Sequence, residues 1–253
     1  MTKFIAALPM YDWPENMAEV DAEWESMRKR LLEQGVDAPL RLVRRNADMP
    51  PVPGGIRDAG GAVIAPDPAI LPPDELDRDA LWRHPKLLFS QACWGPLEHG
   101  LGKHVRVLGQ PDYSAYEGGD GQYYSSAIVM RAGEAPPAPD DSSPIPLDLL
   151  RGRRFAYNSD DSLSGKIAFT RDLEAMGEDL SIFPEHVETG GHRNSIIAVA
   201  EGRADVAAID CRSWALARRF EPMAAKVVVV GWTSRRKGLP FITALESPLT
   251  KLP

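Results

Sequence analysis

The hydrophobic pattern of the first thirty-five residues predicts a buried strand followed by an amphipathic helix. Residues 4–8 form a short apolar run that ends at Pro9, which fits a strand leading into a turn. Apolar residues then recur at steps of three and four, namely Met17, Val20, Trp24, Met27 and Leu31. This spacing gives one apolar helix face, which we expect to end near Gly35.

Strand-like and helix-like segments continue to alternate along the rest of the chain. The predicted strands are residues 40–43, 62–65, 86–90, 105–108, 123–130, 154–157, 206–209 and 226–230. The predicted later helices are residues 166–176 and 192–201. Strands separated by helices indicate an α/β fold with mostly parallel sheets. The proline-rich residues 136–146 favour an exposed connection, because proline disrupts regular elements.

Composition and charge narrow the class of partner. The chain has 253 residues, of which 43% are hydrophobic and 26% charged, so it has enough apolar material for one or two cores. Its net charge of -7 argues against a nucleic-acid partner, which requires a concentrated field of lysine and arginine. Any anion must therefore be captured by local donors.

The N-terminus and the cysteines bear on the compartment. The first apolar run is broken by Pro9, and is too short for a signal-peptide core or a membrane span. We therefore expect no membrane insertion and a cytoplasmic chain as written, or a periplasmic one if this is a processed form. Cys93 and Cys211 form no CxxC motif, which favours buried thiols over a disulfide.

Sequence motifs for catalysis and cofactors are missing. The chain has no GxSxG, GxxxxGK[ST] or HExxH motif, and its five histidines do not have the spacing of metal ligands. No residue pairs as a nucleophile with its base, so we expect no catalytic residues, no cofactor and no metal. A binding protein is the leading hypothesis.

Four ordered segments resemble the phosphonate-type substrate-binding proteins of ABC transporters, a branch of the type II periplasmic binding proteins. These segments are residues 7–12, residues 121–131, residues 150–157 with 162–165, and residues 190–192 with 204–210. The resemblance covers nearly the whole chain and depends on the ordered set rather than on one segment.

The resemblance implies two α/β lobes with the ligand in a cleft between them. Residues 1–109 with 231–253 would form one lobe, and residues 110–230 the other. It implies a small anionic or zwitterionic ligand of the phosphonate or phosphate kind, and an ABC-transporter permease as partner. A cytoplasmic relative, a lyase or dehydratase on the same fold, and a protein-interaction module without a ligand are the alternatives.

The polar turn at residues 158–165 is the best anion site in the sequence. Ser162, Ser164 and the amides around Gly165 precede a helix, whose first N–H groups have no internal partner and attract anions. The alternative is that one serine only caps the helix. Asp160 and Asp161 would repel an anion, so they either face solvent or meet a cationic group on the ligand.

His192 and Asp210 are expected on the same rim. His192 follows two glycines at a helix start, and the resemblance places a ligand-contacting histidine there. Asp210 ends a strand, where it could accept a hydrogen bond from a ligand amine or hydroxyl. Its alternative role is to cap the helix that begins near Ser213.

Two further groups complete the predicted ligand site. Tyr11 and Asp12 follow the first strand, where an aromatic ring can stack on a small ligand. Tyr123, Tyr124 and Ser125 would lie where the chain crosses between lobes. Because neighbouring strand residues face opposite sides, at most one of the two tyrosines should reach the ligand.

Overall fold

The computed structural model describes residues 4–252, and these fold as two compact units. Unit 2 is the continuous segment Pro111–Gly238, whereas unit 1 combines the chain up to Gln110 with the chain from Leu239 onward. The first three residues, part of the segment considered as an export signal, lie outside the described range.

Unit 1 is built on a four-stranded mixed sheet in the order β1-β4-β14-β5. Strands β1 and β4 are parallel, and β14, from the C-terminal piece, runs antiparallel to both β4 and β5. A separate antiparallel hairpin pairs β2 with β3. The elements are β1 (Ile5–Ala7), α1 (Met17–Glu33), β2 (Ile56–Arg57), β3 (Val63–Ala65), α2 (Arg78–Trp82), β4 (Leu87–Gln91), α3 (Trp94–Glu98), β5 (Val105–Gly109) and β14 (Phe241–Ala244).

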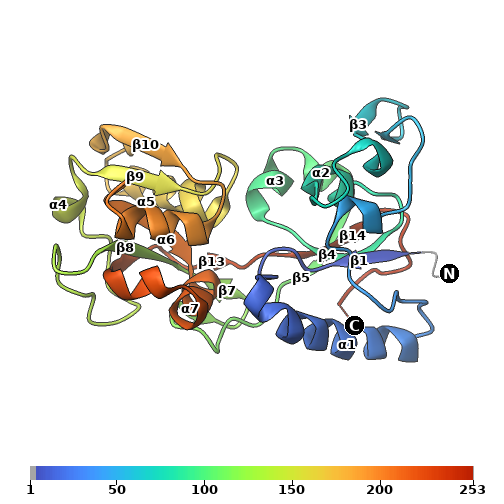
Figure 1. Ribbon diagram of the computed structural model, residues 1–253, viewed down its shortest axis with the longest axis horizontal. Coiled ribbons are helices and arrows are strands. Elements are labelled where there is room, and N and C mark those ends of the chain that lie inside the picture. Colours follow the sequence, from blue (N-terminus) through green and yellow to red (C-terminus); the bar gives the residue numbers. More distant parts are fainter. Residues whose placement is uncertain (1–3, 253) are drawn as a thin grey trace. The chain divides into compact units, whose positions relative to one another are not determined.

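Strand alternation gives the sheet of unit 1 two buried faces. Ile5 and Ala7 belong to one apolar cluster, while Ala6 belongs to another together with Trp24 of α1. Figure 1 shows α1 on one side of this sheet and α2 and α3 on the other. The expected strand-loop-helix order at the N-terminus is therefore present.

Unit 2 contains a five-stranded sheet in the order β10-β9-β11-β8-β12 and a small sheet in the order β13-β7-β6. Strands β10, β9 and β11 are parallel, and β8 is antiparallel to β11 and β12. The elements are β6 (Gly119–Asp120), β7 (Tyr123–Tyr124), β8 (Ser126–Arg131), α4 (Leu147–Leu150), β9 (Arg154–Tyr157), α5 (Ala168–Ala175), β10 (Glu185–Glu188), α6 (His192–Ala200), β11 (Val206–Asp210), α7 (Cys211–Phe220), β12 (Val227–Trp232) and β13 (Arg236–Lys237).

An aromatic cluster forms much of the core of unit 2. The ring centroid of Phe155 lies 5.2 Å from that of Phe169 and 5.1 Å from that of Phe183. Helix α6 packs across β8, β9 and β11 and contributes the fully buried Ile196. The carboxyl ends of β9 and β11 and the start of α6 are thereby held together by a rigid core.

Three predicted strands differ from the structure. Residues 40–43 form no strand, although the Val43 N–H donates to the Ala6 carbonyl at 2.8 Å beside β1. Residues 62–65 form part of the antiparallel hairpin instead of a parallel sheet. Residues 123–130 divide into β7 and β8. Ser125 lies between the two strands, and its N–H donates to the Gly118 carbonyl.

The chain leaves unit 2 after Gly238, which is later than residue 231. Strand β12 continues through Trp232, and β13 pairs with β7, so residues 231–238 belong to unit 2. The proline-rich segment lies along β12, where the Trp232 N–H donates to the Ser143 carbonyl at 2.9 Å. A Cβ atom on Gly231 would lie 2.4 Å from the Pro144 carbonyl oxygen, so this close approach requires glycine.

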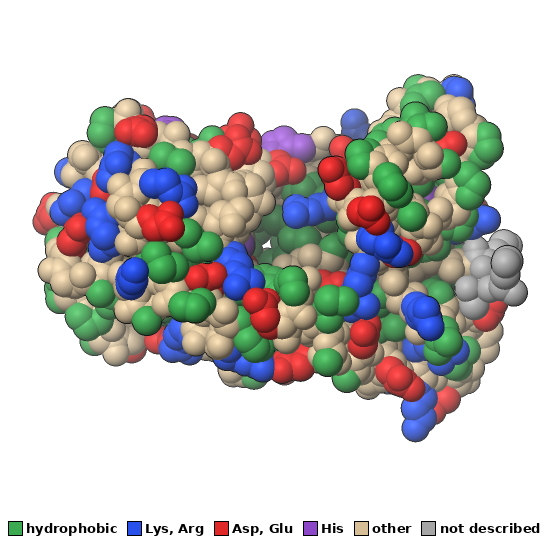
Figure 2. All heavy atoms as spheres, in the orientation of Figure 1, with side chains coloured by type: hydrophobic (Ala, Val, Ile, Leu, Met, Phe, Trp, Pro, Cys, Tyr) green, Lys and Arg blue, Asp and Glu red, His purple; other side chains and the backbone are tan. Residues whose placement is uncertain are grey.

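The visible surface carries charges of both signs, and both cysteines are buried. On the face drawn in Figure 2, lysine and arginine side chains are interspersed with aspartate and glutamate. Within residues 4–252, no helix has the length and apolar character needed to cross a membrane. Cys93 and Cys211 are buried free thiols.

Candidate functional site

A hydrogen-bonded polar cluster lies where the chain leaves β9 and enters the helix of residues 163–175. That helix opens with a π-helical turn, η5 (Leu163–Ile167), and continues as α5. Ser162 is its N-cap, and the Ser162 hydroxyl accepts a hydrogen bond from the Gly165 N–H at 3.1 Å. The Ser164 N–H lies in the first turn of this helix, ahead of the first intrahelical bonds.

Ser164 joins this helix start to α6 and β11. His192 Nε2 lies 2.9 Å from the Ser164 hydroxyl oxygen and 3.3 Å from Asp210 Oδ2. The other carboxylate oxygen of Asp210 accepts from the Ser213 N–H at 2.9 Å and caps α7. Asp210 thus makes the capping contact that was the alternative to a ligand contact, and it also contacts the histidine.

Ser126 is a further member of the cluster, which the sequence did not single out. Its hydroxyl donates to the Ser164 carbonyl at 2.9 Å, and its own N–H donates to the Thr233 hydroxyl at 2.8 Å. The sequence pointed to the neighbouring Ser125 instead. The break between β7 and β8 sets which serine faces the helix start, and this break has no clear sequence signal.

Asn158 is the second residue that the sequence did not single out. Its Oδ1 atom is buried and has no hydrogen-bond partner among the described residues. A Cβ atom placed on Gly165 would lie 1.8 Å from that oxygen and 3.2 Å from the Ser162 hydroxyl oxygen. The glycine therefore allows the Asn158 side chain to approach the helix start.

Burial sets the ionisation of the histidine. Desolvation lowers the pKa of His192, while the negative charge of Asp210 acts in the opposite direction. The imidazole is therefore neutral near pH 7 and can donate one hydrogen bond through a protonated ring nitrogen. Burial also raises the pKa of the neighbouring Cys211 thiol, which keeps it protonated.

Asp160 and Asp161 lie on the exposed side of the turn. Asp160 forms an ion pair with Lys166, which lowers the pKa of the Asp160 carboxyl. Asp161 accepts a hydrogen bond from the Ser159 hydroxyl at 2.7 Å. Of the two expectations for these carboxylates, the structure has the one in which both face solvent.

The tyrosines of β7 lie outside this cluster. Tyr124 is buried, and its ring stacks on Tyr113 with centroids 5.4 Å apart. Tyr123 is 41% exposed, and both tyrosines belong to the small β13-β7-β6 sheet. Ser125 is buried next to them. The two neighbouring tyrosines do face opposite sides, as the strand alternation required.

Tyr11 and Asp12 belong to unit 1. Tyr11 is 2% exposed, and its carbonyl accepts from the Asn16 side chain at 3.0 Å. Both carboxylate oxygens of Asp12 accept from Arg44, at 2.7 and 3.1 Å. Asp12 is thus engaged within its own unit.

A family model matches residues 102–246, more than half of the chain. Its description is the periplasmic substrate-binding protein of phosphonate ABC transporters. The chain belongs to this family. Its members are solute-binding proteins, so this substrate-binding protein is not an enzyme, and it binds a small solute as a transporter component.

Solved structures of related fold agree with the type II periplasmic-binding-protein architecture of this substrate-binding protein. PhnD1 of Prochlorococcus marinus, in complex with methylphosphonate, is 16% identical with a TM-score of 0.61, covering 97% of this chain and 78% of that one. A phosphonate-transporter binding protein of Pseudomonas aeruginosa is 13% identical with a TM-score of 0.59, covering 98% and 70%. These identities establish the fold alone.

A third structure, a Xanthomonas citri protein with bound chloride, is 15% identical with a TM-score of 0.54, covering 96% of this chain and 78% of that one. A search of curated protein sequences finds no match.

Proposed function

We propose that this substrate-binding protein holds the acidic group of a phosphonate or phosphate-like solute at the start of η5 in unit 2. The Ser162 and Ser164 hydroxyls and the Ser164 N–H bind the oxyanion, His192 and the Gly165 N–H hold the two hydroxyl oxygens in place, and an ABC-transporter permease receives the solute. The observation that carries the proposal is that both serine hydroxyl oxygens already accept or share an internal hydrogen bond at a helix start.

The hydrogen-bond directions favour an anion. When the Ser162 oxygen accepts from the Gly165 N–H, and the Ser164 oxygen accepts from His192, both hydroxyl protons remain available to donate. The Ser164 N–H adds a backbone donor, and the helix start adds the positive end of the helix dipole. In a chain of net charge -7, such fixed short-range donors are what can select an anion.

Asp210 has a positioning role in this proposal. One of its oxygens accepts from the Ser213 N–H and the other lies against His192 Nε2, so the carboxylate orients the imidazole. Asp160 and Asp161 face solvent. None of these three carboxylates is therefore placed to meet a ligand ammonium, and we infer a solute without a cationic group, such as the methylphosphonate bound by PhnD1 of Prochlorococcus marinus.

Calorimetry on serine variants tests the site. Replacing Ser162 and Ser164 together by alanine should weaken binding of methylphosphonate by about 2 to 5 kcal/mol, because two charge-assisted hydrogen bonds are lost. Ser142→Ala is the matched control, since Ser142 is exposed and its hydroxyl bonds only to Asp140 among the described residues.

A screen of methylphosphonate, phosphate, methanesulfonate and 2-aminoethylphosphonate by thermal shift should precede the calorimetry. A solute at 100 times its dissociation constant adds about 2.7 kcal/mol of stability. A double variant that remains folded and binds as tightly as the parent would show that the serines only cap the helix. Selective binding of the aminophosphonate would contradict the inference of an uncharged solute body while leaving the site itself in place.

A further inference from the structure

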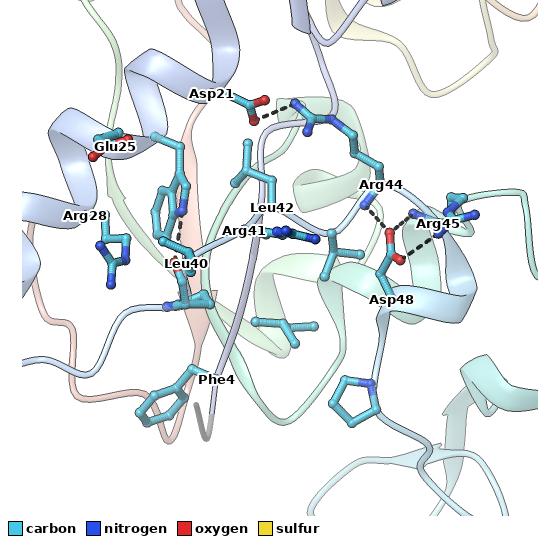
Figure 3. A pocket seen from close by; sticks show the side chains of 15 residues that line it. Phe4, Asp21, Glu25, Arg28, Leu40, Arg41, Leu42, Arg44, Arg45 and Asp48 are labelled. Atoms are coloured by element: carbon cyan, nitrogen blue, oxygen red, sulfur yellow. Dashed lines mark hydrogen bonds and ion pairs between the residues drawn. The ribbon is translucent and has the colours of Figure 1, made fainter. Parts of the chain in front are cut away.

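A second polar site lies in unit 1. An open groove of about 900 Å³ lies between α1 and the extended segment of residues 39–45. Arg28, Arg41, Arg44 and Arg45 line it, which we call the arginine groove. Figure 3 shows Arg28 on the α1 side, Arg45 on the opposite side and Arg41 between them.

Two of these arginines are held by carboxylates. Arg44 binds Asp12 at 2.7 Å and Asp21 at 2.9 Å, and these hydrogen bonds raise the pKa of its guanidinium. Arg45 lies 3.3 Å from both Asp48 and Asp74. These ion pairs offset much of the positive charge of Arg44 and Arg45, and they hold both side chains in place along the groove.

The other two arginines retain donors. Arg28 lines the groove and uses its Nε to donate to the Ala38 carbonyl at 3.2 Å, which leaves its two terminal nitrogens as further donors. Arg41 is exposed, and within residues 4–252 it has no hydrogen-bond or ion-pair partner. In a chain of net charge -7, an arginine that is left unpaired beside three others marks a local anion site.

The carboxylates of Asp21, Glu25 and Asp48 also line the groove, so the four arginines leave it one net positive charge, and it has an apolar part as well. Leu40 is 69% exposed next to Arg41, and the buried Trp24 supports the segment by donating to the Pro39 carbonyl at 3.1 Å. Figure 3 shows Arg28, Arg41 and Arg45 in a row across the groove, whereas the Arg44 guanidinium turns toward Asp21, so the four groups do not face one point. A linear chain that carries several carboxylates and an aliphatic side chain matches this row.

We propose that the arginine groove docks an extended acidic segment of a partner protein. Carboxylates of the segment pair with Arg41 and Arg28, and an aliphatic side chain packs on Leu40. Membership of a transporter-component family supplies the reason to expect a protein partner. The docking does not depend on the solute site, because all of its residues belong to unit 1.

Fluorescence anisotropy on the full chain tests the proposal. The probe is a short fluorescein-labelled peptide of alternating glutamate and leucine. We expect saturable binding that weakens with added salt. Arg41→Ala should weaken it about tenfold, equivalent to 1.4 kcal/mol, and Arg41→Glu by more. Arg203→Ala, at an arginine side chain in unit 2 that is 54% exposed, should leave the peptide affinity unchanged.

Several results would overturn the proposal. These are absence of peptide binding, equal binding by the Arg41→Ala protein, or equal binding of a peptide with glutamine in place of glutamate. Displacement of the peptide by lower concentrations of inorganic pyrophosphate would identify a phosphoanion site instead. Self-association that Arg41→Glu abolishes would identify a second copy of the chain as the occupant. Unchanged melting temperatures of the Arg41→Ala, Arg41→Glu and Arg203→Ala proteins establish that each variant remains folded.

Discussion

The absence of a Cβ atom at Gly165 allows Asn158 to approach the proposed anion site closely. Gly165 lies so close to Asn158 that any Cβ atom would overlap the amide oxygen. That oxygen is buried and has no hydrogen-bond partner among the described residues. The glycine thus serves a close approach and not an unusual backbone angle.

We predict that Gly165→Ala lowers the free energy of unfolding by about 1 to 3 kcal/mol, through overpacking against Asn158. In an Asn158→Ala background the same change should cost less than about 1 kcal/mol, because the clashing oxygen is gone. Urea unfolding followed by circular dichroism of the four proteins gives the coupling energy.

A glycine without such a neighbour provides the control for this prediction. A Cβ atom on Gly60 would meet only Asp58 Oδ1, at 3.3 Å, on an exposed turn. Gly60→Ala should therefore change stability by less than about 0.5 kcal/mol. If the cost of Gly165→Ala is the same with and without Asn158, the contact does not explain the glycine.

At the scale of elements, one carboxylate connects the strands of unit 2. Asp205, just before β11, accepts from the Arg154 N–H and guanidinium at the start of β9, all at 2.9 Å. It also accepts from Arg131 at the end of β8 at 2.8 Å. The Arg154 hydrogen bonds hold the pKa of Asp205 far below its usual range.

We predict that Asp205→Asn destabilises the protein by about 2 to 3 kcal/mol at pH 7, because hydrogen bonds to a charged group are lost. A depressed pKa contributes stability above the unfolded value near 3.9, and this contribution is lost as the pH falls toward the folded pKa. The gap in unfolding free energy between parent and variant should therefore be constant from pH 7 to 5 and narrow below about pH 4.

Asp160→Asn is the comparison for this pH profile. The Asp160 side chain is 74% exposed and pairs with Lys166 at the surface. Exposed ion pairs contribute little to stability, so the variant and the parent should have nearly the same free energy of unfolding at pH 7. A gap for Asp205→Asn that widens toward acid pH would contradict the assigned ion pairs.

At the scale of the whole molecule, the two units differ in how the chain builds them. Unit 2 is one continuous segment with its own core. It holds the whole hydrogen-bonded polar cluster around Ser162, Ser164 and His192. Unit 1 needs two pieces, because β14 lies between β4 and β5. Without β14 these two strands have no common neighbour, and Ile242 is missing from the core.

We predict that residues 111–238, expressed alone, unfold cooperatively in urea, whereas residues 1–110 alone do not. Addition of a synthetic peptide of residues 239–253 should restore secondary structure to residues 1–110, because β14 then pairs with β4 and β5. Circular dichroism follows both. Cooperative unfolding of residues 1–110 without the peptide, or a disordered 111–238 fragment, would refute this division.

The sequence by itself determined the α/β class, the family and most of the central elements. Strong apolar periodicity located α1, and alanine-rich or β-branched runs located β11 and β12, because local patterning suffices where an element is buried. The polar turn before η5 and the glycines before His192 were also readable, since caps and turns are specified by neighbouring residues.

Only the tertiary structure decided which polar groups meet. The contacts of Ser164 with His192 and of Ser126 with Ser164 join residues far apart in the chain, and the approach of Asn158 to Gly165 depends on a side-chain position. Tertiary pairing likewise left residues 40–43 outside any strand and inserted β14 between β4 and β5. Such outcomes arise from packing between distant segments, which local propensity does not encode.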